Sequence, residues 1–437
     1  MIQNNALYND RKSLNFKDTV VPLTLLTLML IVGVVIPIFS WVTFICVSFY
    51  LIIENNNAKV ASVVVFLAPL AAIFKFGSDS LSFFTIIVLI YIARCLVKQK
   101  MYTNFFIMYI FFAGFVLLGI NEGVTVGIKQ LVIPLFVFFC IDSTKQVKKD
   151  TIVKIFIFAI IVASVIGLTK EYIPNMPDYI IDKSLRLDAN VYSDRFSGLN
   201  GDPNYYSVNL LLAFVLTVFL ITKRQISNIL GIALIVAFIV FGTLTSSKTF
   251  FIILALSIII SLYALLKNRR YVLTGLLILA LFMCGYFVIR GDIQFFNIVI
   301  NRFVSGKTIS ELTTGRSDYF VMYMDYFLNN PIVIFVGNGL DRSLLNGCAP
   351  HNTYIDLVYN YGLIGSGILL YLITFCLKVR EREKGIIYYI PIVTVMCAYL
   401  FLSELKYADF QIHIFILLYM ICKTEEPTLN YAAENEM

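Results

Sequence analysis

The sequence predicts an all-α, polytopic integral membrane protein with about fourteen transmembrane helices and two long outer loops. Of its 437 residues, 59% are hydrophobic and only 14% are charged, whereas soluble domains contain about 25% charged residues. Apolar runs long enough to cross a bilayer recur along the chain, and Lys and Arg gather in alternate short loops. The net charge of +7 is therefore attributed to membrane topology, because no basic face with interleaved aromatics indicates nucleic-acid binding.

The chain begins with a polar segment, residues 1–19, which is followed by an apolar run from Val20 to about Phe39. This run has no small-residue cleavage site, so an uncleaved first helix is expected rather than a signal peptide. Pro22 and Pro37 punctuate the region. The pattern leaves open whether it forms one hairpin of two helices or a helix and a re-entrant piece.

Apolar runs begin near residues 20, 37, 58, 82, 103, 124, 152, 206, 226, 249, 271, 353, 386 and 408. Alternate short loops between these runs are basic: 94–100, 144–149, 222–224, 267–270 and 378–384. They all fall on one side of a membrane if the N-terminus is on that side too, and basic short loops mark the cytoplasm. We therefore expect a single membrane domain over 1–437 with a cytoplasmic N-terminus and a cytoplasmic tail over 423–437.

Two connections are much longer than the others, 169–205 and 290–352, and both fall on the outer side. They contain aromatic residues and are not of low complexity, so they are expected to be ordered, and long ordered loops are usually functional. They also hold most of the outer basic residues. Any one of these cations could equally be ordinary solvated loop charge, since long loops tolerate positive charge.

The first candidate site is RFSGLNGDPNYYS, residues 195–207, directly before an apolar run. Asp202 followed by Pro203 is typical of a helix N-cap and first helical residue. The N-terminus of a helix presents unpaired N–H groups and the positive end of the helix dipole, which favour a bound phosphate. Arg195 lies upstream across two glycines that let the backbone fold back. In the alternative, Arg195 only pairs with Asp194 or Asp202.

Two further cations lie at expected helix starts on the outer side. Lys248, in GTLTSSKTFF, stands at the edge of an apolar run, where a lysine that extends towards the membrane surface is the plain alternative. In TTGRSDYFVMYMDYF, Thr314 or Gly315 can cap a helix that begins at Arg316. The aromatic spacing of that helix suits a position along the membrane surface, and the alternative is a packed loop helix with Arg316 in solvent.

His351 opens the segment HNTYIDLVYNYGLIGSG and is expected to begin a spanning helix at the outer face. Such a helix would place four residues on the same stripe as His351: Tyr354, Val358, Gly362 and Gly365. A histidine with a pKa of ~6.5 exchanges protons near neutrality, although an interface histidine is the simpler interpretation. The other histidine, His413, lies within the last apolar run and is given no role.

Several patterns are missing from the sequence. The cytoplasmic loops contain no phosphate-binding glycine loop and no paired carboxylates for a metal–nucleotide complex, and no His or Cys metal motif occurs. Neither a cofactor nor a metal is therefore expected, and an activated nucleotide is an unlikely substrate. Ionisable residues are rare within the apolar runs, which disfavours a transporter.

In four of these stretches the chain resembles the O-antigen ligase and O-antigen polymerase family of bacterial membrane glycosyltransferases. The resemblance covers roughly 195–367 and follows an ordered set of motifs: R-x-x-G…D-P-N (195–204), S-S-K-T (246–249), G-R (315–316) and H-N-x-Y…Y-G-L-I-G (351–365). Upstream of about residue 190 it consists only of hydrophobic spans. The family often has arginine in place of Lys248, and lysine keeps the charge but loses the fork geometry.

The resemblance implies a glycan donor carried on undecaprenyl pyrophosphate at the periplasmic face of the bacterial cytoplasmic (inner) membrane, with transfer that needs no metal. It implies that Arg195 and Arg316 hold the pyrophosphate and that His351 is the catalyst on the acceptor side. Five more residues are expected to bind substrate: Asp202, Asn204, Lys248, Asn352 and Tyr354. Asp194 and Asp202 remain rival bases.

The expected function is a repeat-unit polymerase, which moves a lipid-linked glycan onto a sugar hydroxyl of another lipid-linked unit. The alternatives are a ligase that transfers the glycan to lipid A core or protein, and a flippase for lipid-linked oligosaccharides. The expected partners are the lipid-linked donor and acceptor, membrane lipid and a chain-length regulator protein, with no nucleic acid. The product is left open among O-antigen of lipopolysaccharide, capsule and exopolysaccharide.

Overall fold

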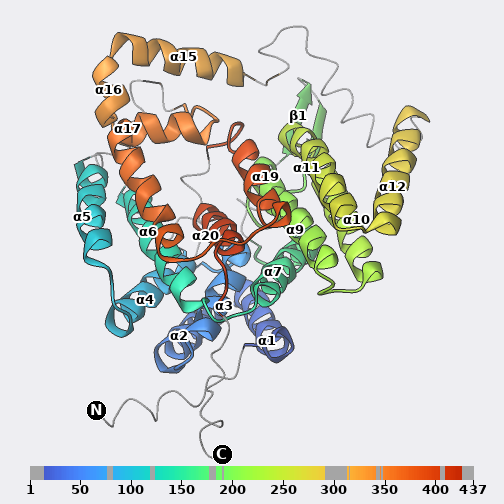
Figure 1. The fold of residues 1–437 in the computed structure, drawn as a ribbon, viewed down its shortest axis with the longest axis horizontal. Coiled ribbons are helices and arrows are strands. Elements are labelled where there is room, and N and C mark those ends of the chain that lie inside the picture. The colour runs from blue at the N-terminus through green and yellow to red at the C-terminus, as the bar shows by residue number, and fades with distance from the viewer. Residues whose placement is uncertain are drawn as a thin grey trace, which may run out of the picture.

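The computed structural model describes residues 14–75, 82–118, 124–176, 184–188, 191–290, 313, 315–340, 345, 348–403 and 409–425. These residues are overwhelmingly helical (Figure 1), which confirms the predicted helical class. Within them, five helices are long and apolar enough to cross a membrane: Phe16–Val35, Lys149–Thr169, Pro203–Thr222, Lys248–Lys267 and Thr353–Thr374. The structure is therefore that expected of a membrane protein.

Each predicted apolar run coincides with a helix. In the first half of the chain these are α1 (Phe16–Val35), α2 (Ile38–Ile53), α3 (Asn57–Leu67), α4 (Phe83–Lys98), α5 (Thr103–Leu118), α6 (Val124–Ser143) and α7 (Lys149–Thr169). Pro37 separates α1 from α2, whereas Pro22 is accommodated inside α1. Ser40 donates to the Gly33 carbonyl across the two helices (3.0 Å), so the N-terminal region forms a helical hairpin.

The second half contains α9 (Pro203–Thr222), α10 (Asn228–Leu244), α11 (Lys248–Lys267), α12 (Tyr271–Arg290), α17 (Thr353–Thr374), α18 (Cys376–Val379), α19 (Ile390–Ala398) and α20 (Asp409–Ile421). A crossing helix needs about 20 residues. At 9 and 13 residues, α19 and α20 fall short of that length, so a count of helices is not a count of crossings.

The central element is α9, which is buried on every side. It packs against α7, α10, α11, α19 and α20 (Figure 1). A helix that is hydrophobic on every face must be enclosed by other helices. The segment LLLAFVLTVFLI gives α9 such a surface. The neighbours of α9 therefore fix the position of its first turn, where the candidate site lies.

The long connections contain short elements of their own. The first holds η2 (Lys170–Tyr172) and an antiparallel pair of strands, β1 (Ser184–Asp188) and β2 (Val191–Asp194). The second holds α15 (Arg316–Asn329) and α16 (Pro331–Val336), and Figure 1 shows α15 along the upper edge of the molecule, above α17. Thr314 and residues 291–312 lie outside the described residues.

The helix α17 is broken at Gly362, which has φ 63° and ψ −177°. The backbone there meets α16 so closely that a Cβ on Gly362 would lie 2.2 Å from the Phe335 carbonyl oxygen. Two carbonyls of the broken turn, those of Tyr359 and Asn360, accept from the N–H groups of Asn338 (2.6 Å) and Gly339 (3.1 Å). A break is tolerated when other donors satisfy the freed backbone groups.

This break corrects one prediction. The helix begins at Thr353 with Asn352 as its N-cap, so His351 stands outside it rather than opening it. The stripe expected to run from His351 through Gly362 is therefore wrong, because a helical wheel does not hold across a non-helical residue. The glycine provides a close contact between two backbones instead of a small surface for a neighbouring helix.

We predict that Gly362→Ala destabilises the protein. Alanine is strained at positive φ and would clash with the α16 backbone, so the loss should exceed about 1 kcal/mol, visible as a lower midpoint of thermal unfolding in detergent. The matched control is Gly367→Ala, in the same helix with no atom within 4 Å of its added Cβ. Equal midpoints for the two variants would contradict this explanation of the break.

Candidate functional site

The first turn of α9 is capped as predicted. Asp202 accepts a hydrogen bond from the Asn204 N–H (2.8 Å), and Pro203 is the first helical residue. Arg195 donates from Nη2 to the Asn204 side-chain oxygen (3.1 Å) and from Nε to the Thr245 carbonyl (2.8 Å). Arg195 is thus held between the start of α9 and the turn that precedes α11.

That turn is built from small hydroxyl residues, which the sequence analysis recognised only as part of a motif. Ser247 caps α11 by accepting from the Phe250 N–H. Ser246 is buried and has a φ of 48°, a conformation that non-glycine residues rarely adopt. Lys248 is half-buried as the first residue of α11. The turn therefore brings the start of α11 beside Arg195.

Arg316 reaches the same place from a distant part of the chain. It begins α15, as predicted, after Gly315 at φ 78°, and its Nη1 donates to the Thr249 hydroxyl in the first turn of α11 (3.0 Å). Burial lowers the pKa of Arg316, while the nearby Tyr205 and Asp202 act to raise it. Since a guanidinium stays charged in proteins, α15 places a permanent cation near the starts of α9 and α11.

His351 is connected to this cluster through α15. Its ring lies 5.7 Å from the ring of Tyr319, at 38°, and Tyr319 follows Arg316 by one helical turn. His351 has a φ of 50°. Residues held in this left-handed region cost about 1–3 kcal/mol and cluster at functional sites, so the backbone at His351 is an independent sign that its placement matters.

Two residues expected to bind substrate make contacts with the protein. The Asn352 side-chain oxygen caps α17 by accepting from the N–H groups of Tyr354 (2.9 Å) and Ile355 (3.1 Å), and its amide donates to the Leu400 carbonyl (3.1 Å). The Tyr354 hydroxyl donates to the Met396 carbonyl (2.8 Å). These contacts position the start of α17, whereas Arg195 and Arg316 lie at the starts of α9 and α11 and His351 lies against Tyr319.

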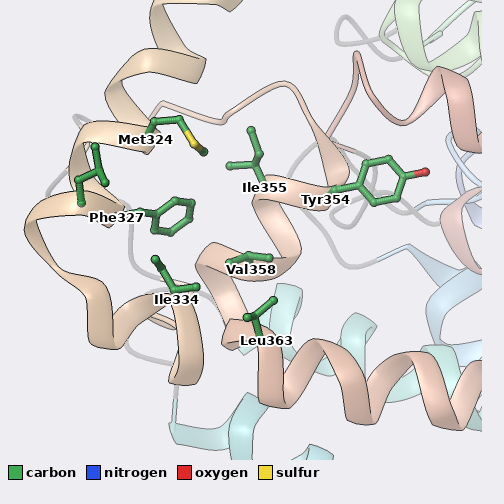
Figure 2. Close-up of a pocket in the computed structure, with 8 residues that line it drawn as sticks. Met324, Phe327, Ile334, Tyr354, Ile355, Val358 and Leu363 are labelled. Atoms are coloured by element: carbon green, nitrogen blue, oxygen red, sulfur yellow. The ribbon is translucent and has the colours of Figure 1, made fainter.

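An apolar cavity of about 450 Å³ lies between α15, α16 and α17 (Figure 2). It is lined by Met324, Phe327, Leu328, Ile334, Tyr354, Ile355, Val358 and Leu363. Figure 2 shows the Tyr354 ring directed away from the other lining residues. The cavity is about 16 Å along α15 from Arg316, at 1.5 Å per residue, so one helix carries both a cation and an apolar wall.

Several residues around the two arginines could not be predicted from the sequence. Thr245, Thr249 and Tyr205 supply a carbonyl, a hydroxyl and a phenol around the two arginines, and only the folded chain brings them together. Asp356 is fully buried in the first turn of α17. An acidic residue in a first helical turn is a signal that the sequence offered. Among the residues that the structure describes, no group of His, Cys, Asp and Glu could hold a metal ion.

We predict that Asp202→Ala lowers the stability of the protein by about 1 kcal/mol, because alanine cannot cap α9, whereas Asp202→Asn retains the cap and most of the stability. Thermal unfolding in detergent measures both. Asp325→Ala, at an exposed position of α15, is the control and should be neutral. If Asp202→Asn were as unstable as Asp202→Ala, the carboxylate charge rather than the cap would be the stabilising feature.

The site is defined from its geometry alone, because no family model, no curated protein and no solved structure matches the chain. Arg195 contacts the start of α9, Arg316 contacts the start of α11, and the ring of His351 lies against Tyr319 of α15.

Proposed function

We propose that this protein is a metal-independent glycosyltransferase of the O-antigen polymerase type, which joins lipid-linked repeat units at the periplasmic face of the bacterial inner membrane. In this proposal about fourteen segments lie in the membrane, both termini are cytoplasmic, and the cluster around α9 faces the periplasm. The observation that carries the proposal is the placement of Arg195 at the start of α9 and of Arg316 at the start of α11, with Asp202 of the α9 cap near enough to act on Arg316.

Such an arrangement suits a diphosphate. Helix N-termini bind phosphate through their N–H groups and dipole, and guanidinium groups pair with phosphate oxygens in a fixed fork. Here two helix starts and two arginines are combined in one cluster, with Lys248 beginning α11. A single phosphate would need fewer cations, so a pyrophosphate is the favoured ligand.

The apolar cavity supports an amphiphilic substrate. An isoprenoid chain attached to the pyrophosphate would extend from the cations to an apolar surface within a short distance. The cavity between α15, α16 and α17 offers that surface about 16 Å along α15 from Arg316, and its lining is apolar. The cations at the helix starts together with the apolar cavity match a lipid pyrophosphate better than a soluble nucleotide sugar.

The chemistry follows from these positions. A sugar hydroxyl of the acceptor attacks the anomeric carbon of the donor, the bond from that carbon to the pyrophosphate oxygen breaks, and lipid pyrophosphate leaves. Arg195 and Arg316 stabilise the charge that grows on the leaving oxygen. One such donor lowers the activation barrier by ~2.7–4 kcal/mol. His351 accepts the proton of the attacking hydroxyl, which is worth about 10²–10⁴-fold.

We predict that Arg195→Ala, Arg316→Ala and His351→Ala each reduce chain growth by at least about 10²-fold while protein levels stay normal. Purified protein is incubated with lipid-linked repeat units, and the glycan ladder is measured. Arg382→Ala, an exposed arginine in the 378–384 loop, is the control and should extend chains normally.

The same assay separates the alternatives. Transfer of finished chains to lipid A core or protein, without elongation, would indicate the ligase. Movement of lipid-linked units across a vesicle membrane without any longer product would indicate a flippase. Unchanged ladders in all three variants would remove the assigned site.

We also predict that Val358→Trp, which fills the apolar cavity, raises KM for a long-chain isoprenoid donor by about tenfold, equivalent to about 1.4 kcal/mol. A donor with a short isoprenoid should be affected much less, because its tail does not enter the cavity. The control is Leu370→Trp, at an exposed position on α17. Equal effects on both donors would exclude the cavity as the tail site.

A further inference from the structure

His413 lies in the middle of α20 and is completely buried. Its Nδ1 is 3.0 Å from the Tyr399 hydroxyl, and its Nε2 is 2.8 Å from the Asn209 side-chain oxygen. A neutral imidazole that carries its proton on Nε2 satisfies both contacts, since it donates to the amide oxygen and accepts from the phenol. The imidazole therefore links three segments: α9, α20 and the turn after α19.

That turn, residues 399–403, is in contact with both sides of the candidate site. Its Tyr399 carbonyl accepts from the Thr353 N–H (2.9 Å) at the start of α17, two residues after His351. Its Ser403 carbonyl accepts from the hydroxyl of Tyr205 (3.2 Å), in the first turn of α9. Residues 399–403, which we call the brace, thus join the helix start beside the cations to the helix start beside the histidine.

Additional bonds strengthen the connection to α17. The Thr353 hydroxyl donates to the Leu402 carbonyl, and the Asn352 amide donates to the Leu400 carbonyl (3.1 Å). Three of the residues involved are almost fully buried: Thr353, Tyr399 and Leu402. In such surroundings an unmade hydrogen bond carries its full desolvation cost, so the brace and the start of α17 move together.

We propose that His413 is a positioning residue, which holds the brace against α9 and thereby sets the distance between His351 and the Arg195–Asp202 end of α9. The consequence for catalysis rests on the proposed function. His413 does not contact the cluster itself; it acts through Tyr399, Thr353 and Asn352. Apolar residues in place of the imidazole and its two partners would pack without any polar group to satisfy, and such a replacement is often neutral or stabilising, so we attribute the polar network to placement rather than to stability.

The test compares a single variant with an apolar triple variant. His413→Leu leaves Asn209 and Tyr399 without their imidazole partner, so it should lower both stability and kcat. Combining His413→Leu with Asn209→Leu and Tyr399→Phe removes all three polar groups, which should restore much of the stability. We expect kcat of the triple variant to stay about 10²-fold low with KM little changed, because a misplacement of about 1 Å has that effect.

A second measurement does not depend on activity. Hydrogen–deuterium exchange of the peptide 351–357 should be faster in both variants than in the natural protein, because the Thr353 N–H loses a fixed acceptor. The control is Thr217→Val, which removes a buried hydroxyl of α9 that bonds within its own helix and should leave both exchange and kcat unchanged.

The outcomes separate the two proposals. If the natural protein extends no glycan, the proposed function fails, and the exchange rates still decide whether His413 fixes the start of α17. If the triple variant regains normal kcat and normal exchange along with its stability, His413 is only a packing residue and the inference is overturned. Rapid exchange together with normal kcat would equally refute a positioning role.

Discussion

The structure depends on the complete enclosure of α9. Because α7, α10, α11, α19 and α20 surround it, the first turn of α9 has a fixed position at the end of the bundle. The proposed functional groups are connected to that turn. Arg195 bonds to it directly, Asp202 and Tyr205 of the turn act on the charge of Arg316, and the brace joins the turn to α17. A rigid apolar centre thus holds polar groups that come from loops.

Much of the fold could be predicted because helical periodicity and hydropathy are local properties. The starts of α9 at Pro203 and of α15 at Arg316 follow from the residues that precede them, whereas the hairpin of α1 and α2 is one of two arrangements that Pro22 and Pro37 left open. The break at Gly362 could not be predicted, because a glycine in an apolar run is equally compatible with a straight helix. Only the approach of α16, whose chain passes at Phe335, distinguishes the two.

The candidate site was accessible to sequence reasoning in part. The sequence predicts Arg195, Arg316 and His351 near helix starts, and the fold places Arg195 at α9, Arg316 at the first residue of α15 and His351 just outside α17. Their partners could not be predicted: Thr249 belongs to the S-S-K-T motif and Tyr319 to the aromatic spacing of α15, but neither pattern says which residue each side chain contacts. His413 was set aside because a buried histidine in an apolar helix gives no hint of which groups face it, and those groups come from two other segments.

The left-handed backbone of His351 affects which substitutions at this position stabilise the protein. Glycine adopts that conformation without the strain of a side chain, so a replacement that relieves strain is available at this position. Stabilising changes at strained sites commonly reduce activity. Selection for thermal stability alone would therefore tend to replace His351. A lineage that keeps His351 retains the backbone strain together with the proton-accepting imidazole.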